Sequence, residues 1–332
     1  MKILIFGGAG FVGFHLTNFL IRNGIKVTVV DNLSSKNSLI NSRQLIKYAE
    51  FYKKNIESFK TKKIFDVIIN LASNPSVINK KDSNKKVIQT NFLGTLNSAE
   101  LAISMGARYI FFSTSRVYDD SLLNKINYKI INDKFVPRSN QNIEGINKNG
   151  ISEIFSKNPS SLYGITKLQS EDLIKYLSKN HKLSFVINRF GLITGLNQSF
   201  HGFHGIIPFW ISSLKQKKKL NYIGFNGKGN QTRDILHISD LCNLIYNQIN
   251  YKQNINSIFN VGGGAKNSIS LLNLTNIIED LSNEKLYIGS IFNNRNFDIP
   301  YYVTNNSKVS KFFNWKINYS KIEIIKELYD NL

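Results

Sequence analysis

Short apolar runs alternate with amphipathic stretches along the first half of the chain. The runs predict buried strands at Lys2–Phe6, Lys26–Val30, Glu50–Lys54, Phe65–Leu71, Tyr109–Ser113 and Leu183–Arg189. Helical spacing predicts helices at Phe11–Asn23, Val87–Met105 and Ser161–Asn180. Strands that are apolar throughout are typical of a parallel sheet covered on both faces. The pattern therefore predicts an α/β fold with a doubly wound parallel sheet.

The pattern changes in the second half of the chain. After Arg189 it loosens into Gly-rich and aromatic sequence, and only three elements are predicted, at Asp240–Asn250, Ser257–Val261 and Ser270–Ser282. We expect a first domain at 1–189, joined by about 236–264, and a smaller mixed α/β lobe at 190–235 and 265–332. The polar stretch 119–160 is long for a connection, which predicts a lid or a disordered segment.

The amino-acid composition excludes several classes of protein. The single cysteine, Cys242, excludes a disulfide framework and a cysteine metal cluster, and no His/Cys/carboxylate set has the spacing of metal ligands. No apolar run reaches the length of about 18 residues that predicts a membrane span. The chain starts directly with an apolar strand and lacks the features of a signal peptide, so we expect a cytoplasmic protein without a membrane partner.

The net charge of +21 first suggests a polyanion partner such as a nucleic acid. However, the cations are 35 Lys against 8 Arg, and the chain also contains 44 Asn. Lys and Asn both have A-rich codons, and Arg is the residue preferred for bidentate phosphate and base recognition. We therefore interpret the charge as compositional drift and expect no nucleic-acid partner.

Glycines follow the first predicted strand in the pattern G-x-x-G-x-x-G, at Gly7, Gly10 and Gly13. At a strand–helix junction, such glycines allow close approach to a pyrophosphate placed on the helix N-terminus. The second strand is followed by Asp31, whose carboxylate can accept from a ribose 2′-hydroxyl and would repel a 2′-phosphate. The combination predicts a Rossmann-type domain that binds NAD rather than NADP. A ligand-free structural turn is the alternative.

Tyr163 and Lys167 form a Y-x-x-x-K pair, so both face one side of the predicted helix. A lysine ammonium near the phenol favours the phenolate, which can act as a base near neutral pH. Thr114 follows the fifth strand, where a doubly wound sheet presents residues to its ligand. Alone, the pair would indicate only a solvated helix face.

With these residues, the chain resembles the extended short-chain dehydrogenase/reductases of the nucleotide-sugar epimerase/dehydratase group. The resemblance covers nearly the whole chain. Its motifs are Gly7–Gly13, Asp31, Leu71–Ser73 (pattern L-A-A), Asn91–Thr95 (N-x-x-G-T), Ser113–Tyr118, Tyr163–Lys167, Arg233–Asp240 (R-D-x-x-H-x-x-D), Asn260–Gly263 and Arg295–Asp298 (R-x-x-D).

The resemblance implies roles for individual residues. Thr114, Tyr163 and Lys167 would be the catalytic set. NAD would contact Gly7, Gly10, Phe11, Val12, Gly13, Asp31, Asn32, Asn55, Ile56, Leu71, Ala72, Ser73, Asn91, Ser113, Tyr163 and Lys167. The nucleotide-diphosphate sugar would contact Thr114, Ser115, Arg116, His201, Arg233, Arg295 and Asp298. Arg233 and Arg295 would bind the diphosphate, and Asp298 a ribose or a neighbouring arginine. A homodimer that pairs through the helices at Val87–Met105 and Ser161–Asn180 is also implied.

Departures from the group's sequence patterns reduce the number of candidate reactions. Sugar 4,6-dehydratases carry Asp-Glu where this chain has Ser115 and Arg116, which argues against dehydration. Leu192 stands where the R-x-x-N pattern has Asn, which puts a 4-epimerase contact to the diphosphate in doubt. These features resemble the CDP-paratose 2-epimerases (CDP-tyvelose epimerases), so a CDP-sugar is the favoured substrate.

Three hypotheses remain. In the first, the enzyme inverts C2 of a CDP-3,6-dideoxyhexose through a transient keto sugar, and NAD stays bound because no net redox change occurs. In the second, it is a UDP- or GDP-sugar 4-epimerase or 4-keto reductase of the same group. In the third, it is a non-catalytic basic binding protein on a Rossmann fold, against which the intact Thr114, Tyr163 and Lys167 set argues.

Overall fold

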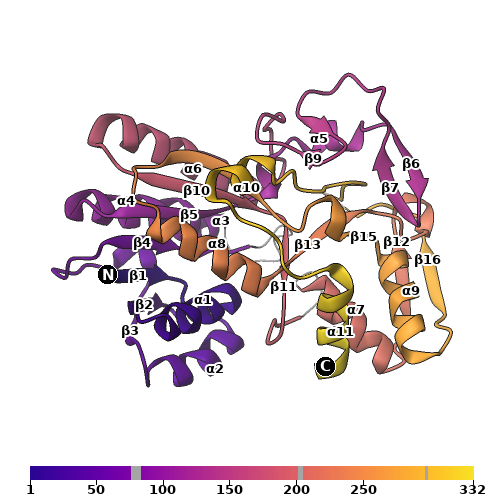
Figure 1. The fold of residues 1–332 in the computed structure, drawn as a ribbon, viewed down its shortest axis with the longest axis horizontal. Helices are drawn as coiled ribbons and strands as arrows, with labels where there is room; N and C mark the ends of the chain where they lie inside the picture. The colour runs from indigo at the N-terminus through magenta and orange to yellow at the C-terminus, as the bar shows by residue number, and fades with distance from the viewer. Residues whose placement is uncertain (76–83, 201–204, 296–297) are drawn as a thin grey trace. The chain divides into compact units, whose positions relative to one another are not determined.

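The computed structural model describes residues 1–75, 84–200, 205–295 and 298–332 (Figure 1). The chain divides into two compact units. Unit 1 consists of Met1–Val117, Lys157–Arg189 and Cys242–Phe259. Unit 2 consists of Tyr118–Ser156, Phe190–Leu241 and Asn260–Leu332. The stretch 118–156 thus groups with unit 2, whereas the sequence analysis assigned it to the first domain.

A seven-stranded sheet is the centre of unit 1. Its order is β14-β10-β5-β4-β1-β2-β3. The strands are β1 (Lys2–Phe6), β2 (Lys26–Asp31), β3 (Glu50–Lys53), β4 (Val67–Asn70), β5 (Arg108–Thr114), β10 (Phe185–Phe190) and β14 (Asn256–Val261). The pairs β1–β2, β1–β4, β2–β3 and β4–β5 are parallel. The predicted α/β class with a Rossmann-type sheet is confirmed, because the order reverses between β1 and β4 as in a doubly wound fold.

Helices cover both faces of this sheet. On one face, α4 (Gly94–Met105) and α6 (Leu162–His181) bury Ala102 and Ile174 in a core that also contains Phe6 and Phe111. On the other face lie α1 (Phe11–Arg22) and α8 (Ile238–Asn250), whose Phe19 and Tyr246 rings are 5.9 Å apart (Figure 1). The helix α2 (Lys36–Leu45) packs beside α1. The strands are apolar throughout because both faces are covered.

The helix predicted at Val87–Met105 is not regular. It consists of α3 (Asn84–Ile88), a π-helical turn at Gln89–Leu93, and α4. A π-helical turn widens the backbone spiral and occurs mostly at functional sites. Here it contains Asn91, which is 1% exposed. Apolar spacing could not reveal the turn, because the flanking helices preserve an amphipathic pattern.

Unit 2 has its own hydrophobic core. Trp210 of α7 (Ile206–Lys215), Leu274 of α9 (Leu271–Ser282) and Leu328 of α11 (Lys321–Asn331) are buried in it. Its strands include β11 (Leu192–Thr194), β13 (Arg233–His237) and β15 (Ser268–Ile269) in one sheet, and β12 (Leu220–Ile223) with β16 (Ile288–Ile291) in another. A further helix, α10 (Ser307–Phe313), precedes α11.

The polar stretch 119–160 is structured, so the expectation of a disordered segment is wrong, and the expectation of a lid stays a prediction. It contains α5 (Asp120–Asn124), the hairpin of β6 (Tyr128–Ile131) and β7 (Lys134–Pro137), and the hairpin of β8 (Ile146–Asn147) and β9 (Gly150–Ile151). A few apolar side chains anchor it within unit 2. Phe155 is fully buried, and the Phe135 ring lies 4.1 Å from that of Tyr128. These few apolar residues are scattered among Asn, Lys and Ser, so the composition of the stretch did not indicate that it is structured.

The described residues show neither a membrane-spanning helix nor a metal site. None of their helices is both long enough and apolar enough to cross a membrane. Within the same residues, no group of three or more His, Cys, Asp or Glu side chains is arranged to hold a metal ion.

Candidate active site

The glycine turn and the segment Leu71–Ser73 follow neighbouring strands, β1 and β4, in unit 1. The strand order reverses between these two strands. In open α/β sheets, ligands bind at the carboxyl ends of the strands at such a point. Gly7 follows β1 at φ +76°, and a Cβ there would lie 2.7 Å from the backbone nitrogen of Ala72. Only glycine therefore allows the two segments to approach this closely.

The start of α1 fits a bound pyrophosphate. Its N-cap, Gly10, provides no side chain to cap the helix, and no acidic residue lies in the first turn. The backbone N–H groups and the positive end of the helix dipole are therefore suited to an anion. A Cβ on Gly13 would lie 2.3 Å from the carbonyl oxygen of Gly7, so the turn packs too tightly for any side chain. Phe11 and Val12 form the first helical turn.

Asp31 ends β2 beside this turn. Its Oδ2 accepts from the N–H of Ala9 at 3.0 Å, and its Oδ1 accepts from the N–H of Leu33 at 2.8 Å. Burial raises the pKa of Asp31, and these backbone hydrogen bonds lower it. A carboxylate has about four acceptor positions, so both oxygens can also accept from ribose hydroxyls. The turn, the helix start and this carboxylate fit the predicted NAD.

Tyr163 and Thr114 come together in unit 1, as the sequence predicts. Tyr163 lies in the first turn of α6, which begins after the N-cap Ser161, and Thr114 ends β5. Burial raises the pKa of Tyr163, whereas the neighbouring hydroxyl groups of Thr114 and Ser73 and the positive charge of Arg116 lower it. The phenol therefore has two hydroxyl groups and a cation in its surroundings.

Lys167 lies one turn after Tyr163 and is 1% exposed. Its Nζ donates to the carbonyl oxygen of Phe112 at 2.8 Å and lies 4.6 Å from the centre of the Phe111 ring. Burial lowers the pKa of the Lys167 ammonium to about 7, and the negative charge of Glu171 raises it. From the Y-x-x-x-K spacing, Lys167 was expected to supply the positive charge that favours the phenolate. In this structure the cation that lowers the pKa of Tyr163 is Arg116.

A buried ion pair next to Lys167 was missed by the sequence analysis. Glu171 is fully buried one turn after Lys167, and Arg189 at the end of β10 donates to it from Nη2 at 2.5 Å and from Nε at 3.0 Å. Ser113 donates to the same carboxylate at 2.5 Å. The i, i+4 spacing of Lys167 and Glu171 could have indicated that the two side chains are neighbours on one helix face. Ser113 was predicted to contact NAD, but in this structure its hydroxyl donates to Glu171.

The remaining predicted NAD contacts also lie in unit 1. Asn91 in the π-helical turn donates to Thr166 Oγ1 at 3.1 Å and accepts from the N–H of Asn74 at 2.8 Å. Ile56 is buried, and Asn32 and Asn55 are exposed. Leu71 and Ala72 are partly buried after β4. The contacts of these residues with NAD stay predictions.

The predicted substrate contacts lie in two groups. Ser115 and Arg116 follow Thr114 in unit 1 and are partly buried. In unit 2, Arg233 Nη2 donates to Asp298 Oδ1 at 3.2 Å, so Asp298 contacts the neighbouring arginine, one of the two roles expected for it. Arg295 is exposed, three residues before Asp298 in the chain. The predicted contact His201 lies outside the described residues.

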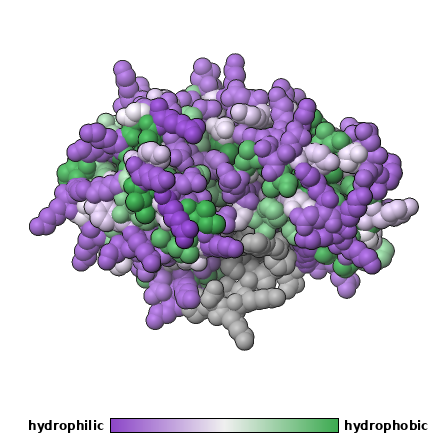
Figure 2. All heavy atoms as spheres, turned by 90° about the horizontal axis from the view of Figure 1, so that it is seen from below, coloured by the Kyte–Doolittle hydropathy of each residue, from purple (hydrophilic) through white to green (hydrophobic). Residues whose placement is uncertain are grey.

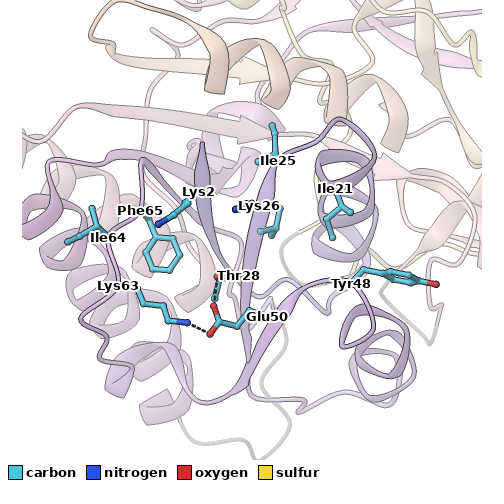
Figure 3. A pocket seen from close by; sticks show the side chains of 11 residues that line it. Lys2, Ile21, Ile25, Lys26, Thr28, Tyr48, Glu50, Lys63, Ile64 and Phe65 are labelled. Atoms are coloured by element: carbon cyan, nitrogen blue, oxygen red, sulfur yellow. Dashed lines mark hydrogen bonds and ion pairs between the residues drawn. The ribbon is translucent and has the colours of Figure 1, made fainter.

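A separate cavity of about 540 Å³ lies at the opposite ends of the strands (Figure 3). Lys2, Lys26 and Glu50, the first residues of β1, β2 and β3, line it. Figure 3 shows Glu50 joined to Thr28 and Lys63. The cavity is therefore not the candidate active site, because Gly7, Asp31 and Thr114 lie at the carboxyl ends of their strands.

Known proteins resemble this chain in both sequence and fold. The NAD dependent epimerase/dehydratase family matches residues 3–262. CDP-paratose 2-epimerase of Salmonella typhi is 27% identical over 99% of this chain and 98% of its own length. A putative UDP-glucose 4-epimerase of Methanocaldococcus jannaschii is 29% identical over 81% of this chain and 79% of its own. The structure of UDP-glucuronic acid 4-epimerase from Bacillus cereus, solved with UDP-glucuronic acid and NAD, superposes with a TM-score of 0.80 at 25% identity, covering 99% and 98% of the two chains.

The chain belongs to the NAD dependent epimerase/dehydratase family. The predictions of an NAD-dependent sugar-nucleotide epimerase and of NAD as its cofactor are thereby confirmed.

Proposed function

We propose that this enzyme inverts C2 of a CDP-3,6-dideoxyhexose, converting CDP-paratose to CDP-tyvelose. The similarity over nearly the full length to the CDP-paratose 2-epimerase of Salmonella typhi carries this proposal. Two features of the chain support it. Ser115 and Arg116 replace the acidic pair of a dehydratase, and Leu192 replaces the Asn of the R-x-x-N pattern.

Tyr163 and Thr114 would handle the proton in this reaction. NAD, when bound, supplies an acceptor and donor of hydride. Tyr163 as phenolate accepts the proton of the sugar hydroxyl, and Thr114 orients that hydroxyl by a hydrogen bond. Lys167, at the base of the site, would hold a ribose hydroxyl of NAD. After the keto sugar turns, Tyr163 returns the proton to the oxygen of the inverted carbon.

Unit 2 would supply the contacts to the substrate's diphosphate. Arg233 is already oriented, because it donates to the carbonyl oxygens of Thr232 and Ile299 at 2.8 Å each as well as to Asp298. A guanidinium held in this way can present a fixed face to a phosphate. Arg295 is exposed and would add a second positive charge.

We also propose a homodimer that pairs through the helices at Val87–Met105 and Ser161–Asn180. Large apolar side chains on these segments are exposed in the single chain. Ile88, Leu93 and Tyr176 are 40%, 43% and 60% exposed. Pairing of two copies would bury them.

A panel of CDP-, UDP-, GDP- and dTDP-sugars, followed by NMR, tests the proposal. We expect inversion of the CDP-3,6-dideoxyhexose at C2 without added NAD. The control is Tyr163→Phe, which removes one oxygen and should lower turnover by about 10²–10⁴-fold. Exclusive turnover of UDP-sugars at C4 would favour the second candidate, a 4-epimerase, which the similarity to the Methanocaldococcus jannaschii protein supports.

A further inference from the structure

The cavity of about 540 Å³ at the amino-terminal ends of β1, β2 and β3 has no part in the candidate active site (Figure 3). Its charged lining consists of three lysines and one glutamate, Lys2, Lys26, Lys63 and Glu50. Its volume is usual for a small-molecule site, for which the range is about 300–1,000 Å³. We propose that the cavity binds a small amphiphilic anion, in which a phosphate or carboxylate group is attached to an apolar body.

Lys2 and Lys26 place two positive charges side by side. Lys2 on β1 is the register partner of Lys26 on β2. Side chains at such positions stand on the same face of a sheet, and like charges there repel each other. The Asp66 carboxylate accepts from the backbone N–H of Lys2 at 2.6 Å. Within the described residues, neither Asp66 nor another carboxylate forms an ion pair with the ammonium of either lysine. An anion bound between the two lysines would relieve their repulsion.

Glu50 does not neutralise this lysine pair, because its carboxylate is already engaged. Glu50 on β3 is the register partner of Thr28 on β2. Its Oε2 accepts from Thr28 Oγ1 at 3.2 Å, and its Oε1 accepts from the Tyr52 hydroxyl at 2.6 Å. Lys63 forms an ion pair with the same carboxylate (Figure 3). Glu50 and Lys63 therefore balance each other, and the positive charge that is left in the cavity is that of the lysine pair.

Apolar side chains line much of the rest of the cavity. Phe65, before β4, is 4% exposed, and Ile21 lies in the last turn of α1. Figure 3 shows Lys26 between Phe65 on one side and Ile21 on the other. The lining residues Ile64 and Tyr48 are 61% and 71% exposed. Exposed apolar side chains in a cavity favour a ligand with an apolar body over a bare ion.

Calorimetric titration of the NAD-loaded enzyme with phenyl phosphate tests the proposal, because this probe joins an anion to an aromatic ring. An excess of NAD keeps the cofactor site filled. We expect a dissociation constant on the order of 1 mM or below. Inorganic phosphate lacks the ring and benzyl alcohol lacks the charge, so each should bind at least about tenfold more weakly.

Two variants assign the binding to the cavity. Lys2→Gln with Lys26→Gln removes both unpaired charges and should weaken the binding of phenyl phosphate about tenfold. Ile64→Ser should weaken it about threefold, because apolar contact is lost, and should leave the binding of inorganic phosphate unchanged. The matched control is Lys179→Gln with Lys182→Gln, which removes the same charge from exposed lysines of unit 1 outside the cavity. It should leave the dissociation constant unchanged.

Thermal unfolding shows that the variants fold. Lys2→Gln with Lys26→Gln should unfold at the wild-type temperature or above it, since a repulsion is removed. The proposal is overturned if phenyl phosphate does not bind at about 10 mM, or if this double variant binds it as tightly as the wild type. It is equally overturned if the control variant weakens binding as much, or if inorganic phosphate binds as tightly as phenyl phosphate.

Discussion

Lys167 is an ionisable side chain kept where water hardly reaches it. Its ammonium has one carbonyl oxygen and one aromatic face as near partners, and burial lowers its pKa to about 7. Such an arrangement costs stability, because a charged amine is removed from water. We interpret the cost as the consequence of keeping an amine beside the reactive phenol.

The stability of the Lys167→Met variant should reveal this cost. Between pH 7 and about 10.5, the lysine is protonated in the unfolded chain and neutral in the folded one, so wild-type stability rises with pH across this window. Below pH 7 both states are protonated and this contribution is constant. We expect Lys167→Met to be the more stable protein at pH 7, by roughly 1–2 kcal/mol.

Urea denaturation at pH 7 and pH 9 measures the difference. The advantage of Lys167→Met should vanish or reverse by pH 9, because the stability of the wild type rises by up to about 1.4 kcal/mol per pH unit across this window. Lys175→Met is the control, since Lys175 is an exposed lysine on the same helix. An advantage of Lys167→Met that is equal at both values of pH would contradict the account.

The sequence was a good guide to single residues where a motif fixed both residue type and spacing. It predicted that Tyr163 and Thr114 come together, and in the structure the Thr114 hydroxyl is near enough to Tyr163 to lower the pKa of the phenol. It did not predict that Lys167 donates to the Phe112 carbonyl, or that the buried carboxylate of Glu171 accepts from Ser113 and Arg189. Those contacts depend on where β5 and β10 end relative to α6, which no local spacing specifies.

At the scale of elements, a buried network links β5, α6 and β10 beneath the active site. Glu171 and Arg189 are 0% and 2% exposed, and Ser113 closes the network from β5. Breaking one side of a buried pair leaves an uncompensated charge, which is strongly destabilising. The network therefore ties β5 and α6, which carry Thr114, Tyr163 and Lys167, to each other and to β10.

Glu171→Gln should lower the free energy of unfolding by about 3–5 kcal/mol, because Arg189 loses its counter-charge. Replacing both partners, Glu171→Gln with Arg189→Met, should recover part of this loss, since no buried charge remains. Asp172→Asn breaks the exposed pair with Lys175 on the same helix and should cost less than about 1 kcal/mol. Urea midpoints compare the three variants, and equal effects of Glu171→Gln and Asp172→Asn would disprove the network's role.

The strands of unit 1 could be predicted from sequence because each is a continuous apolar run. The elements within 119–160 could not, because their few apolar anchors are scattered among polar residues. The π-helical turn around Asn91 was hidden for another reason. It preserves the amphipathic pattern on both sides while changing the backbone between them.

At the scale of the whole molecule, the charge of +21 does not point to a nucleic-acid site. Figure 2 shows hydrophilic side chains spread over the face in view. Both ligands assigned to this enzyme, NAD and a nucleotide-diphosphate sugar, are anions. The excess of lysine can therefore contribute weak long-range attraction of the substrate.

Salt dependence tests this interpretation. We expect kcat/KM for the sugar nucleotide to fall only about two- to threefold between 50 and 200 mM NaCl, because distributed charges act over a screened distance. A protein that contacts 6–10 phosphates of DNA would lose about 10³–10⁵ in affinity over the same range. Tight DNA binding with such a steep slope would contradict the assignment.

The central claim is that the sugar is inverted by transient oxidation and reduction at one carbon, with Tyr163 as the base. The fate of the hydrogen on that carbon tests it most directly. The sugar nucleotide, CDP-paratose in our proposal, is converted in D₂O, and the product is analysed by ¹H NMR and mass spectrometry. The account predicts that the original hydrogen is retained at the inverted carbon, because it is carried as hydride and returned. Incorporation of solvent deuterium at that carbon would contradict the account, since it would show inversion by removal of a proton from carbon.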